Sequence, residues 1–528
     1  MAKEGSYLHK LDPIARYFPA VTRPKTHVHF RNKLLWTILI LLIYFVLCNI
    51  SLFGMDPGED MQDPFSHMRW LMGGGQGTIV HLGIGPIVTA SIIMQLFVGA
   101  KIFSLDMSKP EDKRAFQATQ KVLILVMIFV EAIPLVYGYI QPSKALSDVV
   151  GSDWVRVMLI AQIAIGSYMI YLMDGVVSNW GIGSGVSLFI AAGVSQSLIT
   201  GTFSWLSMGG AEGVRAGVIP QTIDELAHTT AGELVGPGML GGAEQNFLDI
   251  LLGTPTALSG SPNTLIALFM TMVIFFLVVY VESCRVELPV AHGRVRGARG
   301  RYPIKLIYAS VIPVILVSAL IANVQMFGQL LWGNAGGGGT WLSELPFIGG
   351  QEWIGRFEDG VAVSGICAYL STPNGIWSWL LPMVSSDFKL MPAVADRATW
   401  QIGVNVVVYL AVMIIGSIIF AKFWIETTNM GSRDVAAQIE RSGMQIPGFR
   451  RDPRVLERVL SRYIPAVTVI SGAFIGALAA FSSLLGTVGG ASGTGVLLVV
   501  SILINLYETM SREQMMEMHP VLRGFLGG

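Results

Sequence analysis

Long apolar segments alternate with polar segments along almost the whole chain. An apolar segment of about 20 residues is long enough to cross a bilayer as a helix. Segments of this kind lie at 34–53, 81–103, 122–140, 154–173, 185–206, 263–282, 304–327, 401–425, 463–482 and 489–508. The pattern predicts an all-α polytopic membrane protein with ten transmembrane helices.

A shorter segment, DPFSHMRWLMGGG at 63–75, interrupts this pattern. Asp63 and Pro64 are a helix start signal, and the glycines from Gly73 are a stop signal. They enclose only about nine helical residues, too few to cross a bilayer. The sequence therefore predicts either a short re-entrant helix inside the protein or a helix lying in the outer interface, which Trp70 would suit.

Composition agrees with a membrane protein, since the 528 residues are 52% hydrophobic and only 13% charged. The formal net charge of zero conceals a strong asymmetry. If residues 1–33 are cytoplasmic, 28 of the 35 Lys and Arg residues fall in cytoplasmic segments. This distribution predicts that both termini are cytoplasmic.

The domain organisation follows from the helices and their orientation. We expect a cytosolic amphipathic segment at 1–33, a first half at 34–206, an external loop at 207–262, a second half at 263–508 and a cytosolic tail at 509–528. The second half contains basic cytosolic loops at 283–303 and 426–462 and an external loop at 328–400.

Two short sequence patterns recur. Residues 86–91 (PIVTAS) resemble 313–318 (PVILVS), and 183–189 (GSGVSLF) resemble 493–499 (GTGVLLV). Both repeats pair helices that are five apart, so the second half would be inverted in the membrane relative to the first. Inverted repeats of five helices place a functional site between the two halves.

The repeated segments are aliphatic where a solute transporter would need polar groups. A ring of aliphatic side chains forms a hydrophobic constriction, although such residues also occur in ordinary helix packing. The predicted ring consists of Val88, Ile92, Val186, Ile190, Ile315 and Leu498, with Val496 as the competing position on the last helix.

The sequence contains no nucleotide-binding motif and no nucleophile–base pair. Its three cysteines have no metal-ligand spacing, and His27 and His29 lack two further ligands. We therefore expect no enzymatic activity, no cofactor and no metal site. The alternative function is a secondary transporter of small solutes, for which Glu131 is the one strong polar group at mid-membrane depth.

Eight motifs, in order along the ten-helix layout, resemble the SecY family, the large subunit of the protein-conducting Sec channel, with the archaeal branch most similar. They are RNKLLWT (31–37), LGIGPIVTASIIMQL (82–96), GIGSGVSLFIAAGV (181–194), VELPVAHGRVRG (286–297), RYPIKLIY (301–308), YLSTPNG (369–375), RYIP (462–465) and SGTGVLLVV (492–500).

The resemblance implies a pore between the halves, with the aliphatic ring at its waist and the short helix as a plug. The plug residues would be Asp63, Pro64, Phe65, Met68, Arg69, Trp70 and Leu71, with Gly73 to Gly75 and Gly77 as hinges. It also implies a lateral gate between helices 2 and 3 and helices 7 and 8. The gate residues would be Thr89, Ser91, Glu131, Val311 and Ser318, although many relatives carry Asn at the position of Val311.

The basic cytosolic loops carry more arginine than topology requires. Arginine binds RNA phosphates well, and the resemblance implies ribosome docking through Arg294, Arg296, Arg299, Arg451 and Arg454. The implied partners are small SecE-type and accessory (SecG or beta-type) subunits, a ribosome with its nascent chain and ribosomal RNA, signal peptides and membrane lipids. The implied location is the cell (plasma) membrane of an archaeon.

Overall fold

A computed structural model of the chain describes residue 13 and residues 17–55, 72–100, 102–103, 105, 109–138, 140–206, 217–228, 264–292, 299–305, 311–332, 349–358, 361–373, 375–384, 394, 397–428, 430–441, 444–445, 453–490 and 492–518.

Within these residues, nine helices are long and apolar enough to cross a membrane. They are α2 (Phe30–Leu47), α5 (Pro110–Gly138), α7 (Ser152–Trp180), α8 (Gly185–Phe203), α11 (Leu265–Ser283), α12 (Ile312–Trp332), α16 (Thr399–Thr427), α18 (Pro453–Leu485) and α19 (Gly493–Met518). A shorter apolar helix, α4 (Gly85–Gly99), is the tenth. Each predicted apolar segment overlaps one of these helices, so the ten-helix layout is confirmed.

The helices do not end where the apolar segments end. α5 begins at Pro110, well before the predicted 122, and α18 begins at Pro453 instead of 463. These extensions are polar, because a helix that leaves the bilayer continues in water with solvated side chains. α4 begins later than predicted, at Gly85, since the residues before it form tight turns in which Gly83 adopts a φ of +53°.

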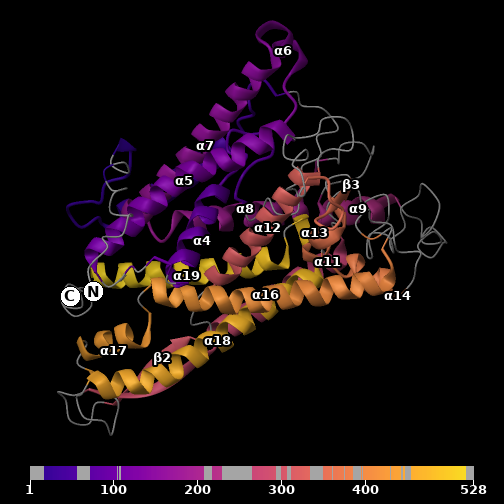
Figure 1. Ribbon diagram of the computed structural model, residues 1–528. Coiled ribbons are helices and arrows are strands. Elements are labelled where there is room, and N and C mark those ends of the chain that lie inside the picture. The colour runs from indigo at the N-terminus through magenta and orange to yellow at the C-terminus, as the bar shows by residue number, and fades with distance from the viewer. Residues whose placement is uncertain are drawn as a thin grey trace.

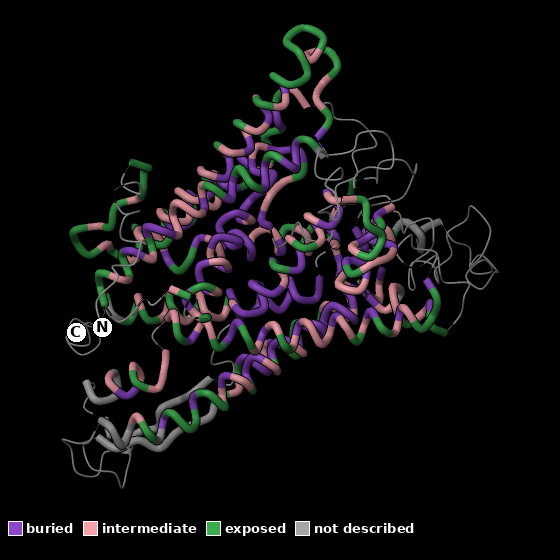
Figure 2. Tube along the Cα trace, viewed as in Figure 1, coloured by how far each residue is buried: buried purple, intermediate pink, exposed green. Residues whose placement is uncertain are grey.

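The two halves meet along a buried core (Figures 1 and 2). Helix α4 contacts α12 through the hydrogen bond of Asn323 to Thr89, and the start of α8 lies near the middle of α19, where a Cβ at Gly183 would be 3.6 Å from Leu506. The other end of α8 meets the short 3₁₀ helix η6 (Val488–Gly490) at the contact of Gly201 with Gly489. This opposite direction of paired helices is the geometry that an inverted repeat requires.

The outer faces of the bundle are apolar. Phe276 on α11 is 69% exposed and Val407 on α16 is 67% exposed. Figure 2 shows exposed positions along the outer faces of the helices and buried positions inside. Apolar side chains on the outside of a helical bundle are expected where lipid is the solvent.

The two basic loops that were predicted to be cytosolic form a small sheet, which the all-α prediction did not include. Strand β1 (Arg285–His292) pairs antiparallel with β2 (Arg299–Lys305), and β1 also pairs with β5 (Met444–Gln445). The strand order is β2-β1-β5. The loops at 283–303 and 426–462 are therefore joined by backbone pairing, with Ala291 opposite Gln445. Helix α17 (Ser432–Arg441) belongs to the same region (Figure 1).

Part of the external loop at 328–400 is folded as well. It contains a hairpin of β3 (Arg356–Glu358) and β4 (Val361–Ser364), followed by α13 (Gly365–Leu370), η4 (Ile376–Ser378) and α14 (Leu380–Val384). Phe357, Ala362, Cys367 and Ala368 form a small core there. Two further short helices, α6 (Lys144–Val150) and α9 (Val218–His228), lie in other connections.

Candidate pore and gate

The six predicted ring residues belong to one hydrophobic cluster at the interface of the halves. Five are almost fully buried, and Val186 is partly buried and packs against them. The exposed fractions are 6% for Val88, 2% for Ile92, 0% for Ile190, 5% for Ile315 and 0% for Leu498. The six residues come from four helices, α4, α8, α12 and α19, so aliphatic side chains from both halves meet in this cluster.

The helix starts bring the repeated segments into register. Pro86 and Pro313 are each the second residue of their helix, so Val88 and Ile315 occupy equivalent positions two residues later. On α8 and α19 the repeat aligns Val186 with Val496 and Leu188 with Leu498. Leu498 is 0% exposed and Val496 is 2% exposed, so both positions on α19 are buried and Leu498 stays a prediction.

One polar bond joins α4 to α12. The side-chain amide of Asn323 donates to the Thr89 hydroxyl at 3.1 Å. That hydroxyl donates its single proton to the carbonyl of Gly85 one turn earlier, at 2.9 Å. Thr89 was predicted as a gate residue, whereas Asn323 was not singled out. An Asn within an apolar helix was the available signal for it.

Glu131 of α5 lies behind this bond. Its side chain is 0% exposed, and neither carboxyl oxygen has a hydrogen-bond partner among the described residues. Thr89 faces the carboxyl group, but its proton is already given to Gly85. A Cβ at Gly85 would lie 3.1 Å from the Glu131 carboxyl oxygen Oε2. The glycine therefore allows the carboxyl group to approach the start of α4.

The remaining predicted gate residues are Ser91 on α4, Ser318 on α12 and Val311 just before α12. Ser91 accepts a hydrogen bond from Gln120 of α5 at 2.8 Å, so it holds α4 to α5. Val311 is 3% exposed and immediately precedes α12. Ser318 is partly exposed on α12. The structure thus brings Thr89 and Glu131 together and leaves Ser91 on a separate contact.

The contact between the halves continues to the end of α4. A Cβ at Gly99 would lie 2.3 Å from the ring of Phe423 on α16. Such a separation is far below van der Waals contact, so only glycine fits at this crossing. The seam between α4 and the second half therefore has a polar contact at Thr89 and a tight apolar contact at Gly99.

A small cavity lies on this seam. Its volume of about 20 Å³ is enough for one water molecule. The lining residues come from both sides of the seam and from the segment before α4: Met72, Ile84, Gly85, Val88, Thr89, Ala319, Ala322, Asn323 and Met326. Met72 thus connects the predicted plug segment to the seam, because its carbonyl also accepts the Ile84 N–H at 2.7 Å.

The predicted plug residues Asp63, Pro64, Phe65, Met68, Arg69, Trp70 and Leu71 lie outside the described residues. The glycines that follow them are closely packed. A Cβ at Gly74 would lie 2.4 Å from the carbonyl oxygen of Val80, and one at Gly75 would lie 2.6 Å from that of Cys48. Gly73 and Gly77 have φ angles of +55° and +63°. These glycines allow a tight backbone fold, a role that the hinge prediction did not include.

The predicted docking arginines are placed only in part. Arg299 is the first residue of β2, and Arg454 lies in the first turn of α18. Arg294, Arg296 and Arg451 lie outside the described residues. The sheet containing Arg299 is held to the core, because Arg285 at the start of β1 contacts Glu508 of α19 at 3.1 Å.

The same end of α19 contacts the start of α2. Lys33 donates to Glu513 at 2.8 Å, and both side chains are mostly buried. The beginning of the first half, the end of the second half and the basic sheet therefore lie on one face of the molecule.

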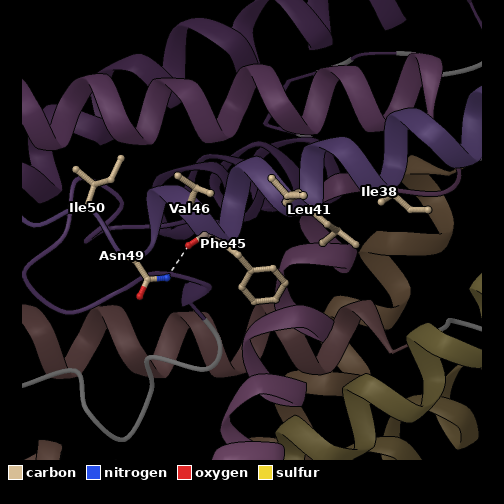
Figure 3. A pocket seen from close by; sticks show the side chains of 7 residues that line it. Ile38, Leu41, Phe45, Val46, Asn49 and Ile50 are labelled. Carbon is tan, nitrogen blue, oxygen red and sulfur yellow. Dashed lines mark hydrogen bonds between the residues drawn. The ribbon is translucent and has the colours of Figure 1, made fainter.

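A shallow groove runs along the outside of α2 (Figure 3). It is lined by Ile38, Leu41, Leu42, Phe45, Val46, Asn49 and Ile50. Its one polar side chain, Asn49, donates back to the carbonyl of Phe45 at 2.8 Å. The groove is therefore an apolar surface on the outside of the first half, and its Leu41 also packs against the buried cluster.

Comparison with known proteins gives matches over the whole of this architecture. The sequence model of the SecY family matches residues 78–507, and that of the plug domain of Sec61p matches residues 42–77. The protein translocase subunit SecY of Haloferax volcanii is 44% identical over 526 residues, which cover 98% of each chain.

Two solved structures also match this chain along nearly its whole length. A protein conducting channel has a TM-score of 0.73 and 36% identity, covering 96% of this chain and 98% of the other. Sec61 in the canine ribosome-channel complex from the endoplasmic reticulum has a TM-score of 0.70 and 34% identity, with the same coverage.

Proposed function

The chain belongs to the SecY family, and from this premise we propose how its residues divide the work of a protein-conducting channel. The chain is the pore-forming subunit of the translocase and a multi-pass protein of the plasma membrane. It translocates signal-bearing unfolded polypeptides and releases membrane helices sideways into lipid. The alternative of a small-solute transporter loses its support, because the relatives are translocase subunits.

Val88, Ile92, Val186, Ile190, Ile315 and Leu498 form a gasket around the moving chain. Their common membership of one buried cluster between the halves is the observation that supports this role. Aliphatic side chains offer no directional hydrogen bonds, so they accept any sequence and leave no buried polar group unpaired when they move.

The lateral gate is the seam between α4 and α12, with α5 and α16 on its flanks. Thr89, Glu131 and the added residue Asn323 form its polar part, Ser91 holds α4 to α5, and Val311 and Ser318 line the α12 side. The bond between Asn323 and Thr89 supports this assignment, since it must break when a signal helix separates α4 from α12.

The segment at 63–75 is the plug, with Asp63, Pro64, Phe65, Met68, Arg69, Trp70 and Leu71 as its residues. The match of residues 42–77 to a plug domain supports this assignment. Met72 is its anchor, because its carbonyl bonds to Ile84 and its side chain lines the gate cavity. Displacement of the plug therefore alters the packing at the gate.

The basic loops dock the ribosome. Arg294, Arg296, Arg299, Arg451 and Arg454 bind phosphates of ribosomal RNA through charge and backbone shape. The pairing of β1 with β5 supports a single docking surface, because it joins the two loops. This face is cytoplasmic, as the distribution of Lys and Arg predicts, and the start of α2 contacts α19 there.

The chain is a passive conduit without a catalytic site. The energy for movement comes from a translating ribosome or another partner. Small SecE-type and accessory subunits complete the complex.

Ribosome binding tests the docking assignment. Charge reversal by Arg299→Glu and Arg454→Glu should abolish co-sedimentation of the reconstituted channel with ribosomes, with a steep dependence on salt for the wild type. The matched control is Arg356→Glu on the external hairpin, which should bind ribosomes like the wild type. Retained co-sedimentation of the double variant would contradict the assignment.

A further inference from the structure

The start of α8 carries part of the pore ring. Val186 is the second residue of this helix, and Ile190 follows one turn later. The first N–H groups of any helix have no partner within the helix and need an external acceptor. Ser184 occupies the N-cap position and is a residue type well suited to capping. Its side chain nevertheless makes no capping bond.

The acceptor comes from the neighbouring helix instead. The carboxylate oxygen Oδ1 of Asp174, on α7, accepts the N–H of Val186 at 2.9 Å. The same carboxylate faces the Gly185 N–H and the Ser178 hydroxyl. A negative charge at a helix start is stabilised by the helix dipole, and its hydrogen bonds are stronger than neutral ones. The backbone of a ring residue is thus bound directly to a charged group.

The surrounding packing leaves little freedom for α8 to shift. A Cβ at Gly185 would lie only 2.6 Å from the Cα of Asp174. The connection before α8 is held as well, because the Ile182 N–H donates to the Thr37 hydroxyl of α2 at 3.1 Å. The start of α8 is therefore fixed by contacts from α7 and α2.

The second half has a corresponding contact of different chemistry. Gly493 at the start of α19 is pressed against the backbone of Ser482. Ser483 of α18 accepts the Thr494 N–H at 3.4 Å, and its hydroxyl lies 2.9 Å from the Thr494 hydroxyl. Both halves thus fix the start of a pore helix against the preceding helix. The first half uses a carboxylate, whereas the second half uses neutral hydroxyls.

We propose that Asp174 is a positioning residue of the pore, which holds Val186 and, through the first turn of α8, Ile190 in the closed ring. This role rests on the proposed function of those two residues as part of the gasket. Loss of the acceptor would free the first turn of α8 and loosen the ring on the side of the first half.

The test is the resting ion conductance of the complete channel complex reconstituted in planar bilayers. Asp174→Ala should raise the resting conductance about five- to tenfold, the size expected when a strong helix cap is lost. Asp174→Asn keeps an oxygen acceptor of the same shape and should remain sealed. The matched control is Ser184→Ala, which removes an exposed hydroxyl without a capping bond from the same connection and should also remain sealed.

Two results would overturn the proposal. One is an Asp174→Ala channel that conducts no more than the wild type. The other is an Asp174→Asn channel that leaks as much as Asp174→Ala, since the acceptor geometry would then not matter. Failure of the proposed function is a separate result. A wild-type channel in which a nascent chain never contacts Val88 would contradict the role of the ring as a gasket, whatever the conductance of the Asp174 variants.

Discussion

The amide group of Asn323 on α12 donates a hydrogen bond of 3.1 Å to the hydroxyl of Thr89 on α4. The two residues come from opposite halves of the chain, and both line the cavity on the seam between the halves. In the proposed lateral gate, a helix that leaves the pore for lipid passes between these two residues. A signal helix would then have to break this bond.

Removal of the bond should make the gate easier to open. Interhelical hydrogen bonds in membranes contribute about 0.6 kcal/mol on average, which corresponds to about threefold in an equilibrium. We expect Asn323→Ala to increase the export of a substrate with a weakened signal sequence by about this factor. The measurement is translocation into proteoliposomes. Leu320→Ala, at an exposed position of the same helix, is the control, and equal export by both variants would contradict the gate role of Asn323.

A substitution at the contact between α4 and α16 should have a larger effect on export. A methyl group at Gly99 would lie 2.3 Å from the Phe423 ring, and overpacking of this kind costs about 1–3 kcal/mol. We expect Gly99→Ala to push α4 from α16 and to allow export of substrates without a signal sequence. Phe423→Ala in the same protein removes the obstructing ring and should restore signal dependence. A Gly99→Ala channel that stays signal-dependent would contradict the close contact.

Glu131 is predicted to destabilise the resting channel. A buried polar group without a partner costs about 1–3 kcal/mol, and both carboxyl oxygens of Glu131 are in that state among the described residues. Glu131→Met keeps the side-chain length and removes the polar atoms. We expect a higher unfolding temperature of the purified complex and slower export. A lower unfolding temperature would mean that the carboxyl group makes a stabilising contact in the resting state.

Cys367 reports on the folded external hairpin. Its side chain is 1% exposed, and burial raises the pKa of the thiol from 9.0 to about 11. At pH 8 the thiol should therefore resist alkylation in the folded protein, whereas the partly exposed Cys284 reacts. The pKa of the thiol is higher in the folded protein than in the unfolded chain. The buried neutral thiol therefore makes its full contribution to the free energy of unfolding below pH 9, and this contribution is lost as the pH rises toward 11. Mass spectrometry of the alkylated peptides measures both rates, and equal rates would contradict the packing.

Hydropathy was sufficient to predict the ten helices but not their ends. The polar turns at the start of α5 and α18 carry no apolar signal, so the predicted segments began about three turns too late. For α12 the predicted start was too early, because the predicted segment at 304–327 included residues that lie in β2 and before α12. A strand in an arginine-rich loop depends on its partner strand, and the pairing of β1 with β5 joins positions far apart in the sequence.

The contacts between residues on opposite sides of the seam could not be predicted from the sequence either. Thr89 and Glu131 stood out as polar groups in apolar helices, and the structure brings them together. Asn323 has the same character, but nothing local indicates which residue of another helix it meets. The glycines after the plug are a similar case. A cluster of glycines in the sequence suggests hinges, whereas the close approach of Gly74 to Val80 is a tertiary contact.

The central claim is that a polypeptide passes through the ring of aliphatic side chains. Photocrosslinking tests it most directly, with a photoreactive residue at Val88 or Ile315 and a stalled ribosome that carries a secretory nascent chain. Phe276 on the lipid side of α11 is the control position and should give no nascent-chain product. The account predicts crosslinks at both ring positions that move along the nascent chain as it is lengthened. Silence at both positions, with the protein folded and the ribosome bound, would contradict it.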